Sequence, residues 1–193
     1  MSLREVQKKL KEFSNLHLDM KSKAATQWLA NNLSSIQTPI RPDSYNKILP
    51  SGPTPLRYVE GCMLFFGYEP KTKDSLPFWD EYPLVVILKK STKSILGLNL
   101  HYLSPNERAN FLERLLRTVD NPEYHKNAPS YFNATYQQMK KNRSLRKCIK
   151  RYYISNIKTR VNVIPSPEWK IVTFIPIDRF RMATKYYVWA KTK

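Results

Sequence analysis

Apolar residues recur at helical spacing through the first 34 residues of the chain, in one group from Val6 to Phe13 and another from Ala25 to Leu33. The pattern weakens between residues 14 and 18, so it predicts two helices in an N-terminal helical arm over residues 1–36. Residues 37–57 contain five prolines and few apolar side chains. This composition predicts a linker or an extended arm.

The middle of the chain carries short apolar runs bounded by proline, glycine and charged residues, at residues 61–68 and 84–88. Such runs are typical of buried strands. A third strand is predicted over residues 95–103, where apolar and polar positions alternate more clearly. Two later strands are predicted over residues 161–164 and 170–176, on either side of a proline-rich turn.

Helices are predicted between and after these strands. Ser104 marks the start of one, because it is a good N-cap residue with Pro105 at the first helical position and Glu107 completing a capping box. Further helical patterns cover residues 131–141 and 178–188.

A basic helix is predicted near residues 144–156. Its apolar face would hold Leu145, Cys148, Ile149 and Tyr152, and its polar face only cations, namely Arg146, Lys147, Lys150 and Arg151. Tyr152 and Tyr153 either contact a sugar-phosphate backbone or pack in the core, and the sequence leaves both interpretations open.

These elements together predict an α+β fold. We expect a small, mostly antiparallel sheet or partly open barrel with surrounding helices, in a core domain over residues 58–193. At 193 residues the chain is long enough to bury a full hydrophobic core.

The charge of the chain is strongly unbalanced. It contains 33 Lys and Arg against 15 Asp and Glu, a formal net charge of +18. Nine basic residues and no acidic residue lie in one stretch, namely Lys140, Lys141, Arg143, Arg146, Lys147, Lys150, Arg151, Lys158 and Arg160. Nucleic acid is the polyanion that most readily neutralises such a surface, so we predict these nine residues as the DNA-binding set. The simpler alternative is a solvated charged face.

Several other classes of protein are disfavoured. With four glycines, no phosphate-binding loop of a nucleotide-binding protein can be written. The two cysteines, 62 and 148, are expected to be reduced core thiols, and no histidine has metal-ligand spacing. We therefore expect no cofactor and no metal. We also expect neither a signal peptide nor a membrane span, because no apolar run is long enough.

An aromatic loop lies between two prolines in the middle of the chain. Phe78, Trp79 and Tyr82 can form a platform on which a terminal base pair stacks, or they can pack onto the sheet as core. Asp80 beside them is expected to cap a turn or to pair with Lys89 or Lys90. His101 is expected to be a hydrogen-bonded structural histidine.

A metal-dependent nuclease is the enzymatic alternative. Asp43, Glu69 and Lys71 can be aligned with a signature in which two carboxylates hold a divalent cation and a lysine positions water. Such a pattern is short and arises often by chance, and Pro70 interrupts the strand that the second acid and the lysine normally share.

A resemblance to a known family rests on a long central box, MLFFGYEPKTKDSLPFWDEYPLVVIL from Met63 followed by ILGLNLHYLSP from Ile95. It continues at Cys148 to Tyr152 and at Pro167 to Trp169. In these segments the chain resembles the DNA end-protector proteins of T-even-type tailed phages. The resemblance implies a virion protein that caps the ends of a linear genome and shields them from host exonuclease.

The predicted function combines these observations. We expect a non-enzymatic, sequence-independent DNA-binding protein, because Lys and Arg without an array of Asn or Gln favour backbone contacts. Its expected partners are double-stranded DNA, especially duplex ends, and other phage virion proteins, in the virion and the host cytoplasm. The runner-up is a structural component of the virion neck, portal or tail that touches DNA or an acidic neighbour.

Overall fold

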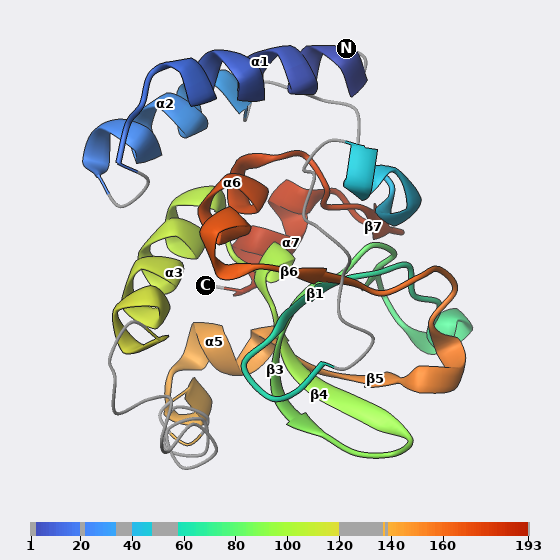
Figure 1. The fold of residues 1–193 in the computed structure, drawn as a ribbon. Coiled ribbons are helices and arrows are strands. Elements are labelled where there is room, and N and C mark those ends of the chain that lie inside the picture. Colours follow the sequence, from blue (N-terminus) through green and yellow to red (C-terminus); the bar gives the residue numbers. More distant parts are fainter. Residues whose placement is uncertain are drawn as a thin grey trace.

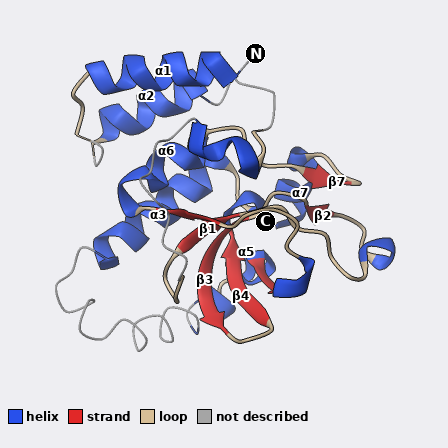
Figure 2. Cartoon of the chain, turned by 45° about the vertical axis from the view of Figure 1, so that its right-hand side comes forward, coloured by secondary structure: helices blue, strands red, loops and turns tan. Residues whose placement is uncertain are grey.

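Two N-terminal helices, α1 (Leu3–Asn15) and α2 (Lys23–Leu33), lie side by side against the rest of the molecule (Figure 1, Figure 2). The break between them includes His17 in the left-handed region, with φ 48°. Ser22 caps α2, since its Oγ accepts a hydrogen bond from Ala25 N at 3.0 Å. The prediction of two helices is confirmed, and their buried residues belong to the same core cluster as the sheet.

The computed structural model describes residues 3–19, 22–33, 40–47, 58–119, 137 and 139–192. Most of the predicted linker over 37–57 therefore lies outside the described residues. Within it, the 3₁₀ helix η1 (Pro42–Lys47) packs onto the core through Tyr45, whose hydroxyl donates to Glu168 Oε2 at 2.6 Å.

The sheet has five antiparallel strands in the order β5-β4-β3-β1-β6 (Figure 1). Its strands are β1 (Met63–Phe65), β3 (Leu84–Lys90), β4 (Ser94–Asn99), β5 (Ile149–Tyr153) and β6 (Asn162–Ile164). An isolated antiparallel bridge joins Tyr68, beyond β1, to Ile157, beyond β5, and so brings the segments that follow these two strands together. The predicted α+β fold with a mostly antiparallel sheet is confirmed.

The sheet is buried on both faces, which explains the continuous apolar run of β3. Leu84, Val86 and Leu88 join the core under helices α3 (Pro105–Val119) and α6 (Trp169–Phe174), which pack against each other. Val85 and Ile87 point to the other face, where they pack in a second cluster with Tyr152. Helix α3 begins as predicted, with Ser104 N donating to Glu107 Oε2 at 2.9 Å.

The predicted basic helix near 144–156 is confirmed only as far as Cys148, and the rest of it is wrong. Helix α5 (Arg143–Cys148), capped by Asn142, is six residues long, and the chain continues as the edge strand β5 and the 3₁₀ helix η4 (Ile154–Asn156). The aromatic and β-branched residues of this segment favour a strand, and pairing with β4 satisfies its backbone. Tyr152 then packs edge-on against Phe66 and Tyr68 at centroid distances of 5.5 and 4.9 Å.

The predicted strand over 170–176 is also wrong, because this segment forms α6. A short buried apolar run satisfies helical and strand patterns alike, and here packing against α3 and α2 favours the helix. The predicted helix over 178–188 is shifted, since β7 (Phe180–Arg181) pairs with β2 (Trp79–Asp80) and α7 spans Lys185–Thr192.

Two smaller differences concern residues 95–103 and 131–141. The strand over 95–103 ends at Asn99 and gives way to the 3₁₀ helix η3 (Leu100–Tyr102). Of residues 131–141, those that the structure describes, 137 and 139–141, are helical. In the described ranges, no helix has both the length and the apolar character needed to cross a bilayer.

Gly97 is required where β3 and β4 approach each other. A Cβ on this residue would lie 2.1 Å from Val85 Cγ1 and 3.0 Å from Val86 O. We expect Gly97→Ala to lower the free energy of unfolding by about 1–3 kcal/mol, measured by urea denaturation. Thr92→Ala in the exposed β3–β4 turn is the matched control and should change it little. Equal stability of the two variants would contradict this account of the β3–β4 contact.

Candidate nucleic-acid interface

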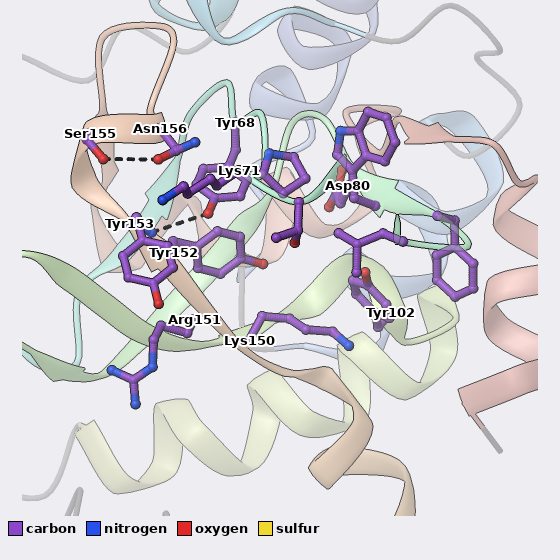
Figure 3. Close-up of a pocket in the computed structure, with 15 residues that line it drawn as sticks. Tyr68, Lys71, Asp80, Tyr102, Lys150, Arg151, Tyr152, Tyr153, Ser155 and Asn156 are labelled. Atoms are coloured by element: carbon purple, nitrogen blue, oxygen red, sulfur yellow. Dashed lines mark hydrogen bonds between the residues drawn. The ribbon is translucent and has the colours of Figure 1, made fainter. Parts of the chain in front are cut away.

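A groove of about 600 Å³ opens between β5 and the loop that precedes β2 (Figure 3). We call it the cationic groove. One wall is built from β5 and η4, and the other from residues 70–80. It is lined by Tyr68, Pro70, Lys71, Thr72, Leu76, Phe78, Trp79, Asp80, Tyr102, Lys150, Arg151, Tyr152, Tyr153, Ser155 and Asn156.

Hydrogen bonds across the open edge of β5 position the loop wall. Glu69 N donates to Asn156 O at 3.1 Å, and Asn156 Nδ2 donates back to Glu69 O at 2.9 Å. Tyr153 N donates to the Tyr68 hydroxyl at 3.3 Å, a bond drawn in Figure 3. These contacts cover backbone groups that an edge strand would otherwise expose.

The other end of the loop is held by a buried polar network around Asp80, which is 3% exposed. Asp80 Oδ2 accepts hydrogen bonds from Asn99 Nδ2 at 2.9 Å and lies 2.7 Å from His101 Nδ1. Its Oδ1 accepts from Tyr82 N at 3.1 Å, and Asn99 Nδ2 also donates to the Tyr152 hydroxyl at 3.0 Å. The network thus joins the loop to β4, η3 and β5.

This network decides two predictions. His101 is a hydrogen-bonded structural histidine, as expected. Asp80 caps the turn at Tyr82, also as expected, but its buried partners are Asn99 and His101 and not Lys89 or Lys90. The alternative of a lysine partner is wrong because the Asp80 carboxylate points into the core, whereas both lysines are exposed at the end of β3.

Two predicted DNA-binding residues, Lys150 and Arg151, lie in the groove itself. The Lys150 side chain extends to Tyr102, with Nζ 4.4 Å from the ring centroid (Figure 3). Burial lowers the pKa of Lys150. Arg151 is exposed and its Nη1 donates to Ser94 Oγ at 3.1 Å. None of the described carboxylates forms an ion pair with either side chain.

The remaining predicted basic residues flank the groove on both sides along the chain. Lys140, Lys141, Arg143 and Arg146 are exposed in and before α5, while Lys147 Nζ donates to Lys191 O at 2.6 Å. Lys158 and Arg160 follow η4 and are exposed, and Lys158 Nζ lies 3.5 Å from Glu69 Oε2. Between Arg143 and Arg151 the basic residues therefore follow a helix about 9 Å long and then a strand about 17 Å long. The single helix that the sequence predicts would be about 20 Å long.

The three predicted stacking residues have different surroundings. Trp79 is half-buried and lines the groove. Phe78 also lines it, but packs against Tyr102, Phe180 and Tyr187 with centroid distances of 6.1–6.3 Å. Tyr82 is buried in the core cluster, and Arg179 lies 5.6 Å from its ring centroid. Of the Tyr152 and Tyr153 pair, Tyr152 is core and Tyr153 is 48% exposed at the groove.

A second hollow of about 590 Å³ shares Tyr68 and Trp79 with the groove but differs in charge. Three carboxylates line it, Glu69, Asp74 and Glu81, together with three cations, Lys73, Lys158 and Arg181. Glu81 Oε2 pairs with Arg179 at 2.9 Å and with Arg181 at 2.7 Å. Among the described residues, Asp80 is the only acid that lines the cationic groove, and its oxygens are engaged in the buried network.

The two carboxylates of the nuclease alternative, Asp43 and Glu69, lie in different surroundings. Asp43 is exposed in η1, which packs beside Asn162 and Glu168. Glu69 lies beside η4 and pairs with Lys73 at 2.6 Å. The part of the chain that the structure describes contains no group of three or more Asp, Glu, His or Cys side chains that could hold a metal ion.

Sequence reasoning missed several residues that shape this site, chiefly Asn99, Leu76, Tyr102 and Asn156. Asn99 carried a signal, because it is a polar residue two positions before His101 in an otherwise apolar alternating segment. No sequence signal identifies the other three, Leu76, Tyr102 and Asn156. Their place in the groove depends on the contact between two segments that are distant in the sequence.

An α+β protein with this excess of positive charge and an aromatic groove bordered by cations is typical of proteins that bind a nucleic-acid backbone. The chain belongs to the family of the phage T4 terminal DNA protecting protein, whose family model matches residues 7–192. The resemblance of the central box is thereby confirmed, and the family's function is protection of the ends of phage DNA. Neither curated proteins nor solved structures gave a match.

The Asp80 network gives a stability prediction. We expect Asp80→Ala to lower the free energy of unfolding by about 3 kcal/mol, because Asn99, His101 and the Tyr82 amide lose a buried acceptor. Asp74→Ala, in the exposed 3₁₀ helix η2 (Lys73–Ser75), is the control and should stay within about 0.5 kcal/mol of wild type. Urea denaturation measures both. A cost for Asp80→Ala no larger than that of the control would show that the network does not hold the loop.

Proposed function

We propose that this protein is a non-enzymatic virion component that binds duplex DNA ends without regard to sequence and thereby blocks exonuclease access. The observation that carries the proposal is the meeting of two sets of residues that lie far apart in the sequence. Trp79 and Phe78 of the loop wall and Lys150 and Arg151 of β5 line one groove. Aromatic faces and uncompensated cations are the two groups that contact bases and phosphates.

Binding without sequence preference is supported by the chemistry of the exposed groups. The basic residues of α5 and those after η4 are Lys and Arg on the surface, suited to phosphate oxygens. The amides near the groove are engaged, Asn99 with Asp80 and Asn156 with Glu69. The exposed Lys and Arg side chains can therefore recognise the charge and shape of the DNA backbone, but the amides are not free to read base edges.

A role in the virion and the absence of catalysis are parts of the proposal that rest on the family. A protein that protects terminal DNA has to be present when the DNA enters the cell. Protection by occlusion needs binding alone. The buried and ion-paired carboxylates around the groove support this view, since they are engaged in holding the structure.

The direct test compares a linear duplex with the same DNA as a relaxed closed circle at about 150 mM salt. We expect tighter binding to the linear form and protection of its ends in a parallel exonuclease digestion. Equal affinity for both forms, without protection, would reduce the function to general DNA contact and contradict end capping.

Charge reversal tests which surface provides the affinity. The triple variant Lys141→Glu, Arg143→Glu, Arg146→Glu should weaken duplex binding and reduce the dependence of log K on log salt by about 0.9 for each phosphate that the variant no longer neutralises. The matched control, Arg4→Glu, Lys8→Glu, Lys11→Glu, makes the same charge change on exposed residues of α1. An equal loss of affinity in both triples would mean that only net charge matters and that α5 is not a contact surface.

Lys150 gives a pH prediction. Its pKa is lowered by burial in the free protein, and a neighbouring phosphate would raise it again. At a pH between the pKa of Lys150 in the free protein and its higher pKa in the complex, binding takes up protons. The affinity for DNA therefore falls as the pH rises through this range. Lys150→Met should remove this part of the pH dependence.

The same variant separates binding from folding. A lysine whose pKa is lowered on folding destabilises the folded state while it is charged. The urea concentration at which Lys150→Met unfolds at pH 7 should therefore be at least as high as that of the wild type. Lys89→Met, exposed at the end of β3, is the control that keeps both the pH dependence and the affinity. Unchanged DNA affinity in Lys150→Met at every pH would remove Lys150 from the interface.

A further inference from the structure

We propose that the cationic groove binds the terminal nucleotides of one DNA strand in unpaired form, so that the protein recognises a single-stranded extension or a frayed end. This inference rests on the proposed binding of DNA ends and names the part of the end that enters the groove. Four features of the described residues support it.

The first feature is size. The groove has a volume of about 600 Å³, within the range of sites that enclose small molecules, which is about 300–1,000 Å³. One or two nucleotides belong to that size class. A duplex end also brings a second backbone, which has to be met outside the groove, on exposed cations such as Arg143 and Arg146 of α5.

The second feature is the type of side chain. Six aromatic residues line the groove, namely Tyr68, Phe78, Trp79, Tyr102, Tyr152 and Tyr153. Proteins that bind single strands combine aromatic faces, on which bases stack, with a cationic path for one backbone. Duplex backbones, by contrast, are contacted by cations on an open surface.

The third feature is exposed apolar surface on facing walls. Leu76 in the loop wall is 37% exposed and Tyr153 on β5 is 48% exposed. Apolar and aromatic side chains that line a groove suit a ligand with an apolar face. A base between the two walls would cover both.

The fourth feature is the distribution of charge. Lys71, Lys150 and Arg151 line the groove, and Asp80, the only acid among its described lining residues, is buried within its network (Figure 3). In the adjoining hollow, across Tyr68 and Trp79, carboxylates and cations are equal in number. A phosphate is therefore attracted to the groove and gains little from the neighbouring hollow.

The test uses a DNA hairpin whose open end is either blunt or extended by four unpaired nucleotides, on the 3′ or the 5′ strand. We expect at least one extension to bind about tenfold more tightly than the blunt hairpin, a factor typical of one stacked base. The fluorescence of 2-aminopurine in that extension should fall on binding, because the base stacks on an aromatic side chain.

Tyr153→Ala is the informative variant, because its side chain is exposed and its backbone hydrogen bond to Tyr68 does not need the ring. We expect it to lose the advantage of the extension and the 2-aminopurine signal, with a smaller loss of affinity for the blunt hairpin, whose end reaches the groove only when it frays. Tyr153→Phe should restore both. Tyr186→Ala, 68% exposed on α7 outside the groove, is the matched control and should behave as wild type.

The outcomes separate the two proposals. Equal affinity for blunt and extended hairpins, with linear DNA still preferred over circles and protected from exonuclease, would overturn the single-strand inference and leave end capping intact. An extension advantage that survives Tyr153→Ala would also overturn the assignment to this groove. If neither hairpin is preferred over a closed circle, both proposals fail.

Discussion

The buried carboxylate of Asp80 is the constraint on which the groove depends. A charge at this depth is tolerated only when its oxygens are paired, and here Asn99, His101 and the Tyr82 amide supply the partners. The backbone oxygen of His101 in turn accepts from Arg108 Nη2 at 3.3 Å and from Trp189 Nε1 at 2.9 Å, which ties α3 and α7 to the same point. Without this connection, the end of the loop that carries Phe78 and Trp79 would be held by the short β2–β7 pairing, the ion pairs of Glu81 and the packing of Phe78, and would lose its link to β4 and β5.

Elements whose sequence signals are local could be predicted, whereas features that depend on long-range contacts could not. Helix α3 was predictable because its capping box lies within four residues, and β3 because a bounded apolar run suits a strand buried on both faces. The segment around residues 144–156 satisfied helical spacing, but its aromatic and β-branched residues favour a strand, and this strand pairs with β4. The individual cations and aromatic residues of the site were visible in the sequence. Their meeting was not, because it depends on the Tyr68–Ile157 bridge between segments about 90 residues apart.

Positive charge on this chain opposes folding, and its placement limits that cost. Where cations lie close to the core, carboxylates accompany them, as Asp178 does for Arg108 at 3.9 Å and Glu81 for Arg179 and Arg181. Arg108 and Lys185 also hold the pKa of Asp178 below its ordinary value, against the effect of its burial. Lys150 differs, since it is partly buried beside an aromatic ring with a lowered pKa and without a carboxylate partner among the described residues. A neighbouring anion would therefore stabilise the charged form of Lys150.

The segments that carry the family resemblance serve mainly the scaffold. Asp80, Asn99, His101 and Tyr152 all come from these segments, and all four are buried in one network. The exposed residues that would meet DNA come from both inside and outside these segments: the loop after Pro70 and Arg151 lie within them, whereas most of α5 and Tyr153 lie outside. In this chain the buried network therefore builds the frame that brings the loop to β5. Side chains that this frame leaves exposed, such as Leu76, Arg151 and Tyr153, can change with little cost to the fold.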